Sequence, residues 1–321
     1  MIGEGEETVK ELLWAFEGKR PKSEIPGIAY LEHGKLIETQ GRSPLTDFDK
    51  LPIPDFSPLR YAKIKVYPVG RVRGCGMDCE FCTVKGKARY ATPERLLEQI
   101  TFLFETRGAK RFFIVDDLFG QDRLETIRLC QLLKDYQKTI KKRFRITVQI
   151  RLDKAKDAEL LRAMREAGIN QVAIGFESPI GEELKAMDKR IKPEEMISLS
   201  RLYYQAGFLI HGMFIFGYPL AGGANFRLPT KERIQRFKKF IKRARIDTVQ
   251  VLLPVPLPGT ELTRRLREQK RIYPKDSLGW EYYDGNFPLF VPDKPMTPEE
   301  MHASIRLIMG RFYRFKHMFH I

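Results

Sequence analysis

From about residue 61 onward the chain alternates between two hydrophobic patterns. Short runs rich in β-branched and aromatic residues predict strands, and longer stretches with apolar residues every three or four positions predict amphipathic helices. The predicted strands are Ile64–Val69, Arg111–Val115, Arg145–Ile150, Gln171–Phe176, Leu209–Phe216 and Thr248–Leu253. The predicted helices between them are Pro93–Thr106, Arg123–Lys138, Asp157–Ala167, Pro193–Ala206 and Lys231–Ala244. This alternation predicts an α/β fold built on a parallel sheet.

Six strands with helices between them predict a partial (β/α)6, TIM-like barrel. In such barrels the chemistry is carried at the carboxyl ends of the strands. The helix signals agree with the pattern: in "ATPERLLEQI", Thr92 suits the N-cap and Pro93 the first helical position.

The two ends of the chain have a different character. Near the start, "VKELLWAFEGK" predicts an amphipathic helix, and the polar, proline-containing Lys35–Asp55 is typical of a linker. After the last predicted strand come the loop "PVPLPGTEL", a short helix, the aromatic segment "GWEYYDGNFPLF" and a helix from Pro298 to about Tyr313. We expect this last part to be an α-helical appendage that covers one mouth of the barrel.

Composition is that of a globular protein, with 43% hydrophobic and 31% charged residues among 321. No apolar run approaches the roughly 20 residues of a membrane helix, and the acidic start "MIGEGEE" is unlike a signal peptide, so a cytoplasmic location is expected. The net charge is 57 − 41 = +16. Because the basic residues fall in short clusters at helical spacing, solvated helix faces are the favoured interpretation, and nucleic acid is not an expected partner.

Three of the four cysteines lie close together in "RGCGMDCEFC": Cys75, Cys79 and Cys82, spaced C-x3-C-x2-C. Clustered thiols favour metal or redox chemistry over a disulfide framework. A closed zinc site would need four ligands, and no second C-x2-C pair exists. Cys130 lies at helical spacing in "TIRLCQLL" and is interpreted as a small buried hydrophobe. Three thiolates suit a [4Fe–4S] cluster whose fourth iron is open to an external molecule.

With Phe81 directly before the last cysteine, this motif resembles that of the radical S-adenosylmethionine (SAM) superfamily, over about Tyr61–Leu257. The resemblance implies that the three cysteines hold the cluster and that SAM chelates the open iron through its amino and carboxylate groups. Reduction then breaks a carbon–sulfur bond of SAM and gives a 5′-deoxyadenosyl radical. It also implies a reductant protein of the flavodoxin or ferredoxin type as a partner.

The same resemblance assigns candidate cofactor-binding residues at strand ends. In "IVDDLF", Asp116 and Asp117 would contact the SAM amino group, and the alternative is a helix-capping pair. Arg151 could pair with the SAM carboxylate, and Glu177 resembles the family's ribose or amine contact. For these two the alternative is a buried ion pair. Phe81 and Gly212, the latter in "GMFIFGYP" near the expected adenine, complete the set, whereas the neighbouring His211 is interpreted as a core histidine.

The two ends also resemble parts of cobalamin-binding radical SAM enzymes. On this view residues 1–60 are the end of a cobalamin-binding domain plus a linker, 61–257 the radical SAM core and 258–321 the appendage. The cobalamin domain itself is expected to be absent from this chain. Cobalamin use is therefore open: either a separate cobalamin-binding polypeptide is a partner, or the enzyme works without cobalamin. Leu12, Leu13, Trp14 and Phe16 would form an interaction face in the first case and would pack on the barrel in the second.

The sequence leaves three hypotheses about function. The leading one is a radical SAM enzyme that performs methyl transfer, rearrangement or ring formation on an unidentified substrate. An RNA-modifying radical SAM enzyme is an alternative, because of the +16 charge and the likeness of "IGFES" and "PGTEL" to methylthiotransferases. Against it, only Cys130 is left for the second cluster of those enzymes. The third is a non-catalytic accessory subunit of a cobalamin-binding polypeptide.

Overall fold

The computed structural model describes residues 1–189, 191–221, 228–274 and 278–313. The chain divides into two compact units, Met1–Pro52 and Ile53–Ile321. Each is described by itself below.

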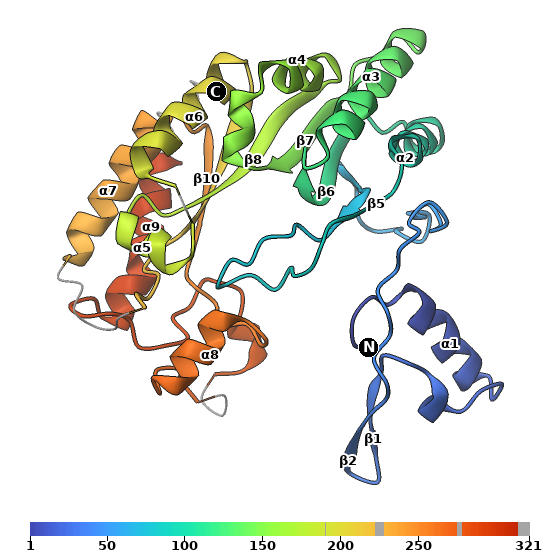
Figure 1. Cartoon of the computed structure of the whole chain (residues 1–321), viewed down its shortest axis with the longest axis horizontal. Helices are drawn as coiled ribbons and strands as arrows, with labels where there is room; N and C mark the ends of the chain where they lie inside the picture. Colours follow the sequence, from blue (N-terminus) through green and yellow to red (C-terminus); the bar gives the residue numbers. More distant parts are fainter. Residues whose placement is uncertain (190, 222–227, 275–277, 314–321) are drawn as a thin grey trace. The chain divides into compact units, whose positions relative to one another are not determined.

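The larger unit is built on a six-stranded sheet that confirms the predicted partial barrel (Figure 1). The strand order is β10-β9-β8-β7-β6-β3, and all neighbours pair in parallel. The strands are β3 (Tyr67–Val69), β6 (Arg111–Phe119), β7 (Arg145–Ile150), β8 (Ile169–Glu177), β9 (Leu209–Ile215) and β10 (Thr248–Leu252). Because the strands are parallel and follow one another in space, all their carboxyl ends meet at one edge.

Helices between the strands cover the convex side of this sheet (Figure 1). They are α2 (Pro93–Arg107), α3 (Arg123–Thr139), α4 (Ala158–Glu166), the short α5 (Gly181–Ala186), α6 (Pro193–Gln205) and α7 (Thr230–Arg243). Thr92 caps α2 as predicted, because its hydroxyl accepts the Arg95 N–H at 3.2 Å. Asp122 and Asp157 cap α3 and α4 in the same way.

Two strand boundaries differ from the prediction. β6 continues past Val115 to Phe119 and so contains Asp116 and Asp117, whose charges hide the strand from a hydrophobic pattern. β3 begins at Tyr67 rather than Ile64.

The core lies between the sheet and the helices. Near α7 it contains an aromatic group in which Phe176 and Phe214 stack at 5.5 Å and Phe237 and Phe240 pack around them. Gly212 lies on the same side of β9 as Phe214, and a Cβ on it would lie 2.9 Å from Phe214 and 3.0 Å from Ile246. Gly212 therefore lies within the strand and does not end it. Its missing side chain leaves space for Phe214 and Ile246 in the core.

The last helix, α9 (Pro298–Phe312), packs beside α7 and β10. The Tyr313 hydroxyl accepts the Val249 N–H at 2.9 Å and donates to the Val249 carbonyl at 2.6 Å. It thereby occupies the exposed edge of the last strand, where an unpaired backbone would otherwise be open to another chain. The appendage thus closes a sheet edge through α9, and the expectation that all of it covers the barrel mouth is wrong for this helix.

The smaller unit contains α1 (Glu6–Phe16), a short 3-10 turn (Lys22–Glu24) and the hairpin of β1 (Ala29–Glu32) and β2 (Lys35–Glu38). The prediction of a linker from Lys35 is therefore wrong for its first residues. Arg42 ties the following segment to α1, through Thr8 at 3.1 Å and an ion pair with Glu11.

Three of the four apolar residues predicted as an interaction face of α1 are exposed. Leu13 is 57%, Trp14 40% and Phe16 73% exposed, while Leu12 is half-buried.

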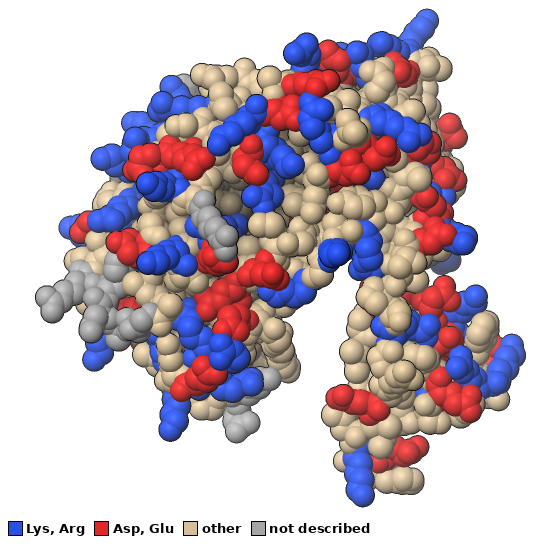
Figure 2. Space-filling model, viewed as in Figure 1, with Lys and Arg blue, Asp and Glu red and all other residues tan. Residues whose placement is uncertain are grey.

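Basic and acidic side chains interleave over the face of the molecule shown in Figure 2. This distribution agrees with solvated helix faces as the origin of the positive charge. In the part of the chain that the structure describes, no helix combines the length and the apolar character of a membrane span.

We predict that Gly212→Ala lowers the stability of the larger unit by about 1–3 kcal/mol, because the added methyl overpacks the Phe214 and Ile246 contacts. The measurement is the thermal or urea midpoint of the metal-free protein. Gly181→Ala is the matched control, since nothing lies within 4 Å of the position of its Cβ. Equal midpoints for the two variants would contradict the packing role.

Candidate functional site

The three clustered cysteines lie on one loop, residues 74–88, here called the cysteine loop. Its stem is the antiparallel pair β4 (Val72–Arg73) and β5 (Arg89–Tyr90), which follows the carboxyl end of β3. Gly74 begins the loop with φ +84°, and a Cβ there would lie 2.7 Å from the Lys87 carbonyl oxygen. The loop therefore emerges where the chemistry of a parallel barrel is expected.

Two carboxylates of β6 hold the beginning of this loop. Asp116 Oδ1 accepts the N–H groups of Arg71 at 2.6 Å and Val72 at 2.9 Å, and Asp117 Oδ2 accepts the N–H of Gly74 at 2.6 Å. The two aspartates thus fix the backbone of the stem and the first loop residue. The helix-capping alternative is wrong, because Asp122 caps α3. Contact of Asp116 and Asp117 with SAM stays a prediction.

Asp116 is the more deeply buried of the pair. Asp116 is only 2% exposed, and its Oδ2 atom has no hydrogen-bond partner among the described residues. Burial raises the pKa of this carboxyl from 3.8 to about 6, although the N–H groups of Arg71 and Val72 oppose that shift.

A neighbouring amide, which the sequence pattern does not single out, supports the first cysteine. Gln121 Nε2 donates to the Cys75 carbonyl oxygen at 3.2 Å. Gln121 follows β6 directly after Gly120, so the same strand end supplies three side chains to the cysteine loop.

The thiols of Cys75, Cys79 and Cys82 are all half-buried. Burial raises the pKa of Cys79; the Lys189 ammonium opposes this, and the Cys82 and Cys75 thiols add to it through their charges. The Cys82 sulfur also accepts the Val84 N–H at 3.4 Å.

Three thiols are a donor set that suits an iron–sulfur cluster. Among the described residues, no three Cys, His, Asp or Glu side chains are arranged to hold one metal ion. An iron–sulfur cube takes each thiolate at a different corner, so its ligands need not converge on one point. Cys130 is 1% exposed in α3 and its pKa is raised by burial to about 12, so it stays protonated and apart. The donor set is therefore three thiols.

Two cations lie near the cysteine loop, one directly after β7 and the other after α5. Arg151 follows β7; its Nη1 lies 3.0 Å from Met77 Sδ, while Nε and Nη2 bind Asp153. Lys189, which follows α5, pairs with Glu177 at 3.0 Å. Its positive charge opposes the rise in the pKa of Cys79 that burial causes. Arg151 and Glu177 thus each have an ion-pair partner, though not one another.

Glu177 ends β8 in a left-handed conformation with φ +60° and is 8% exposed. The irregular register between β8 and β9 at Gly175 and Glu177 accompanies this backbone. A non-glycine residue held there is strained, as is common at functional sites. Lys189 could not be found from sequence, because a charged residue after a short helix belongs to no motif.

The remaining predicted residues behave differently. Phe81 packs against the core and meets Tyr218 edge-on, at 6.1 Å between ring centroids. Gly212, by contrast, faces the helix side of β9, so the structure does not bring it to the cysteine loop. His211 is half-buried with its Nδ1 2.8 Å from the Thr248 hydroxyl, as expected of a satisfied histidine.

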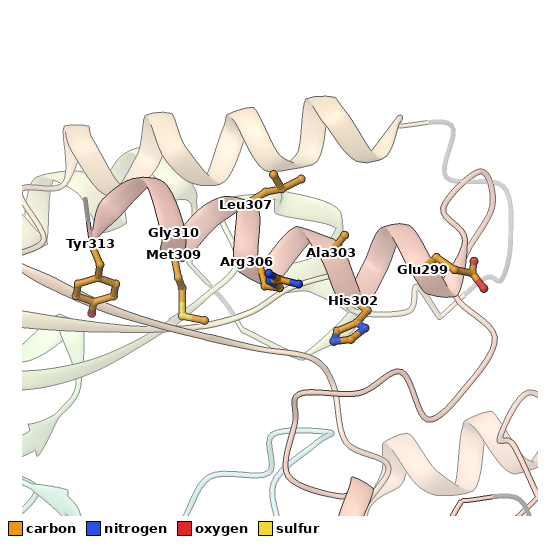
Figure 3. A pocket seen from close by; sticks show the side chains of 8 residues that line it. All are labelled: Glu299, His302, Ala303, Arg306, Leu307, Met309, Gly310 and Tyr313. Atoms are coloured by element: carbon orange, nitrogen blue, oxygen red, sulfur yellow. The ribbon is translucent and has the colours of Figure 1, made fainter. Parts of the chain in front are cut away.

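An open cavity of about 890 Å³ lies along α9 (Figure 3). It is lined by Glu299, His302, Ala303, Arg306, Leu307, Met309, Gly310 and Tyr313. None of the predicted site residues belongs to it, so it is separate from the cysteine loop.

We predict that Asp116→Asn flattens the pH dependence of stability. A folded-state pKa of about 6, above the unfolded 3.8, means that the bound proton stabilises the native protein at low pH and that this contribution is lost as pH rises through 6. The loss amounts to up to about 3 kcal/mol by pH 7. Asparagine keeps the acceptor for both N–H groups but has no such titration. Urea midpoints of the metal-free protein at pH 4.5 and 7 measure this; parallel curves for the two proteins would contradict it.

Comparison with known proteins agrees with these features. The model of the family described as "Radical SAM superfamily" matches residues 70–221, which include the cysteine loop. A protein of Pyrococcus horikoshii named as an uncharacterized methyltransferase is 30% identical over 97% of this chain and 66% of its own length. The anaerobic magnesium-protoporphyrin IX monomethyl ester cyclase of Cereibacter sphaeroides is 24% identical over 99% of this chain and 52% of its own. The chain thus spans about half to two thirds of these relatives.

Solved structures show the same fold. The radical SAM methyltransferase TsrM of Kitasatospora setae superposes with a TM-score of 0.69 at 17% identity, over 99% of this chain and 61% of that one. The cobalamin-dependent SAM radical enzyme OxsB superposes with a TM-score of 0.58 at 19% identity, over 84% of this chain and 39% of that one. These two structures share the fold of the chain. The match of residues 70–221 to the family model and the relative from Pyrococcus horikoshii show that the chain belongs to the radical SAM superfamily.

Proposed function

We propose that this chain is a radical SAM enzyme in which Cys75, Cys79 and Cys82 hold a [4Fe–4S] cluster with one corner open to SAM. The observation that carries the proposal is the donor set: three half-buried thiols share one loop at the carboxyl edge of the sheet, and the fourth is sealed in α3. A bound cluster supplies a single electron, which breaks a carbon–sulfur bond of SAM.

The surrounding side chains would then orient the nucleotide. Arg151 and Lys189 place positive charge at the loop, where the SAM carboxylate and the thiolates carry negative charge. Glu177 offers a carboxylate at the adjacent strand end, suited to the amine or the ribose. Asp116 and Asp117 keep the stem of the loop in place by binding its N–H groups.

Methyl transfer is the reaction class that we propose first. Its support is the names of relatives, which include the hopanoid C-2 methylase of Rhodopseudomonas palustris, 26% identical over 75% of this chain. The cyclase relatives keep ring formation and rearrangement as alternatives. RNA modification has the support of a putative methylthiotransferase of Methanocaldococcus jannaschii at 28% identity, but the buried Cys130 offers no second cluster site.

We predict that anaerobic reconstitution of the native chain gives the visible absorption of an iron–sulfur cluster, about four irons per chain, and SAM cleavage under a strong reductant. Alanine at Cys75, Cys79 or Cys82 should remove most of the bound iron and abolish cleavage, because each thiolate holds its own corner. Cys130→Ala is the control and should retain both. A folded native chain with neither iron nor cleavage would retire the proposal.

Cobalamin-dependent chemistry would bring in a domain outside the residues described. The exposed Leu13, Trp14 and Phe16 of α1 support a docking role for the smaller unit. We predict that adding a cobalamin-binding polypeptide raises the rate of methyl transfer by this chain, and that the mixture shows a corrinoid spectrum. An unchanged rate in the mixture would contradict the docking role.

A further inference from the structure

The second half of the cysteine loop carries a carboxylate, Glu80, directly between Cys79 and Cys82 in sequence. Arg265, on α8 (Glu261–Glu268), binds this carboxylate in a bidentate manner: Nε lies 2.6 Å from Oε1 and Nη2 lies 2.9 Å from Oε2. The Tyr218 hydroxyl donates to Oε2 at 2.5 Å. Both carboxylate oxygens are therefore occupied by donors from the protein.

The arginine also binds two backbone carbonyl oxygens. Nη1 donates to the Leu220 carbonyl at 2.9 Å and Nη2 to the Pro219 carbonyl at 3.0 Å. The segment with these carbonyls is fixed in turn, because the Leu220 N–H binds Asp293, and Asp293 pairs with Arg271. A chain of contacts thus runs from the cysteine loop through α8 into the C-terminal part.

Backbone and ring contacts strengthen the same junction. The Leu262 N–H, in α8, donates to the Glu80 carbonyl oxygen at 3.1 Å. Phe81 packs edge-on against Tyr218, whose side chain is fully buried. Helix α8 therefore contacts the cysteine loop through its backbone and through charge, and Tyr218 adds a ring contact.

Burial distinguishes this ion pair from the others on α8. The side chains of Glu80 and Arg265 are 10% and 12% exposed. The next residue, Arg264, makes ion pairs with Glu261 and Glu268, but its side chain is 60% exposed. Exposed pairs contribute little because water screens them, whereas a two-pronged pair shielded from water fixes geometry and leaves a costly unpaired charge if one partner is removed.

We propose that Glu80 is a positioning residue, and that the contact of Glu80 with Arg265 and Tyr218, here called the Glu80 clamp, fixes the half of the loop that carries Cys79 and Cys82. The proposal deepens the proposed function and rests on it for the identity of the bound group. Asp116, Asp117 and Gln121 hold the half with Cys75, so the two halves have separate anchors. The C-terminal segment is then part of the cysteine site rather than only a cover.

The test uses the metal-free full chain, kept reduced and anaerobic, and measures how fast a maleimide alkylates each cysteine, read by peptide mass. In Arg265→Ala and Glu80→Gln we expect Cys79 and Cys82 to react about tenfold faster, as loss of charge-assisted hydrogen bonds would allow. Cys75 should stay within about twofold of the native rate, because its anchors remain. Arg264→Ala is the matched control and should leave all three rates unchanged.

Two further variants separate the clamp from general loosening. The double variant with both Arg265→Ala and Glu80→Gln should react no faster than either single variant, because both changes break one interaction. If Arg265→Ala fails to fold, as judged by circular dichroism, Tyr218→Phe removes one donor and should give a smaller acceleration at the same two cysteines.

The proposal is overturned if the rates at Cys79 and Cys82 stay at the native value in the folded variants, or if Cys75 accelerates equally. Loss of reconstituted iron to a chelator provides a second readout and should be faster in both clamp variants. Alkylation does not depend on iron or SAM, so a native chain that binds no iron would refute the proposed function and leave the clamp to be judged by the alkylation rates alone.

Discussion

The site depends on one constraint: a loop that carries three thiols must be held still at the edge of a parallel sheet. β6 meets this constraint with Asp116 and Asp117 in its second half, whose carboxylates accept backbone N–H groups from Arg71, Val72 and Gly74. Carboxylates in a strand are unfavourable for burial, and Asp116 shows the cost in its raised pKa. The gain is a stem whose backbone donors are satisfied by a rigid element.

Positive side chains near the loop oppose the negative charge that thiolates would place there. Bringing thiolates together is unfavourable, and burial adds to that in the case of Cys79. Arg151, directly after β7, and Lys189, after α5, bring positive charge to the loop. Glu177, whose backbone at the end of β8 is left-handed, pairs with Lys189. The result is a half-buried group of sulfurs with fixed cations beside it.

The C-terminal segment has two separate structural tasks. Through α9 and Tyr313 it covers the open edge of β10, which an incomplete barrel leaves exposed. Through α8 and Arg265 it contacts the cysteine loop between two of its thiols. An open barrel of six strands thus obtains from its C-terminal segment both the protection of an edge and a second support for its site.

The sequence alone determined the order of strands and helices and the identity of the three thiols, because periodicity and spacing are local properties of the chain. It also fixed Thr92 as a cap and Cys130 as a core residue, since both depend on neighbours within a helical turn. Only the tertiary structure decided what Asp116 and Asp117 bind, that Gly212 serves the core, and that Lys189, Glu80 and Arg265 belong to the site. Arg265 and Glu80 are 185 positions apart, and a contact at such separation depends on how the sheet brings distant segments together, which no local pattern encodes.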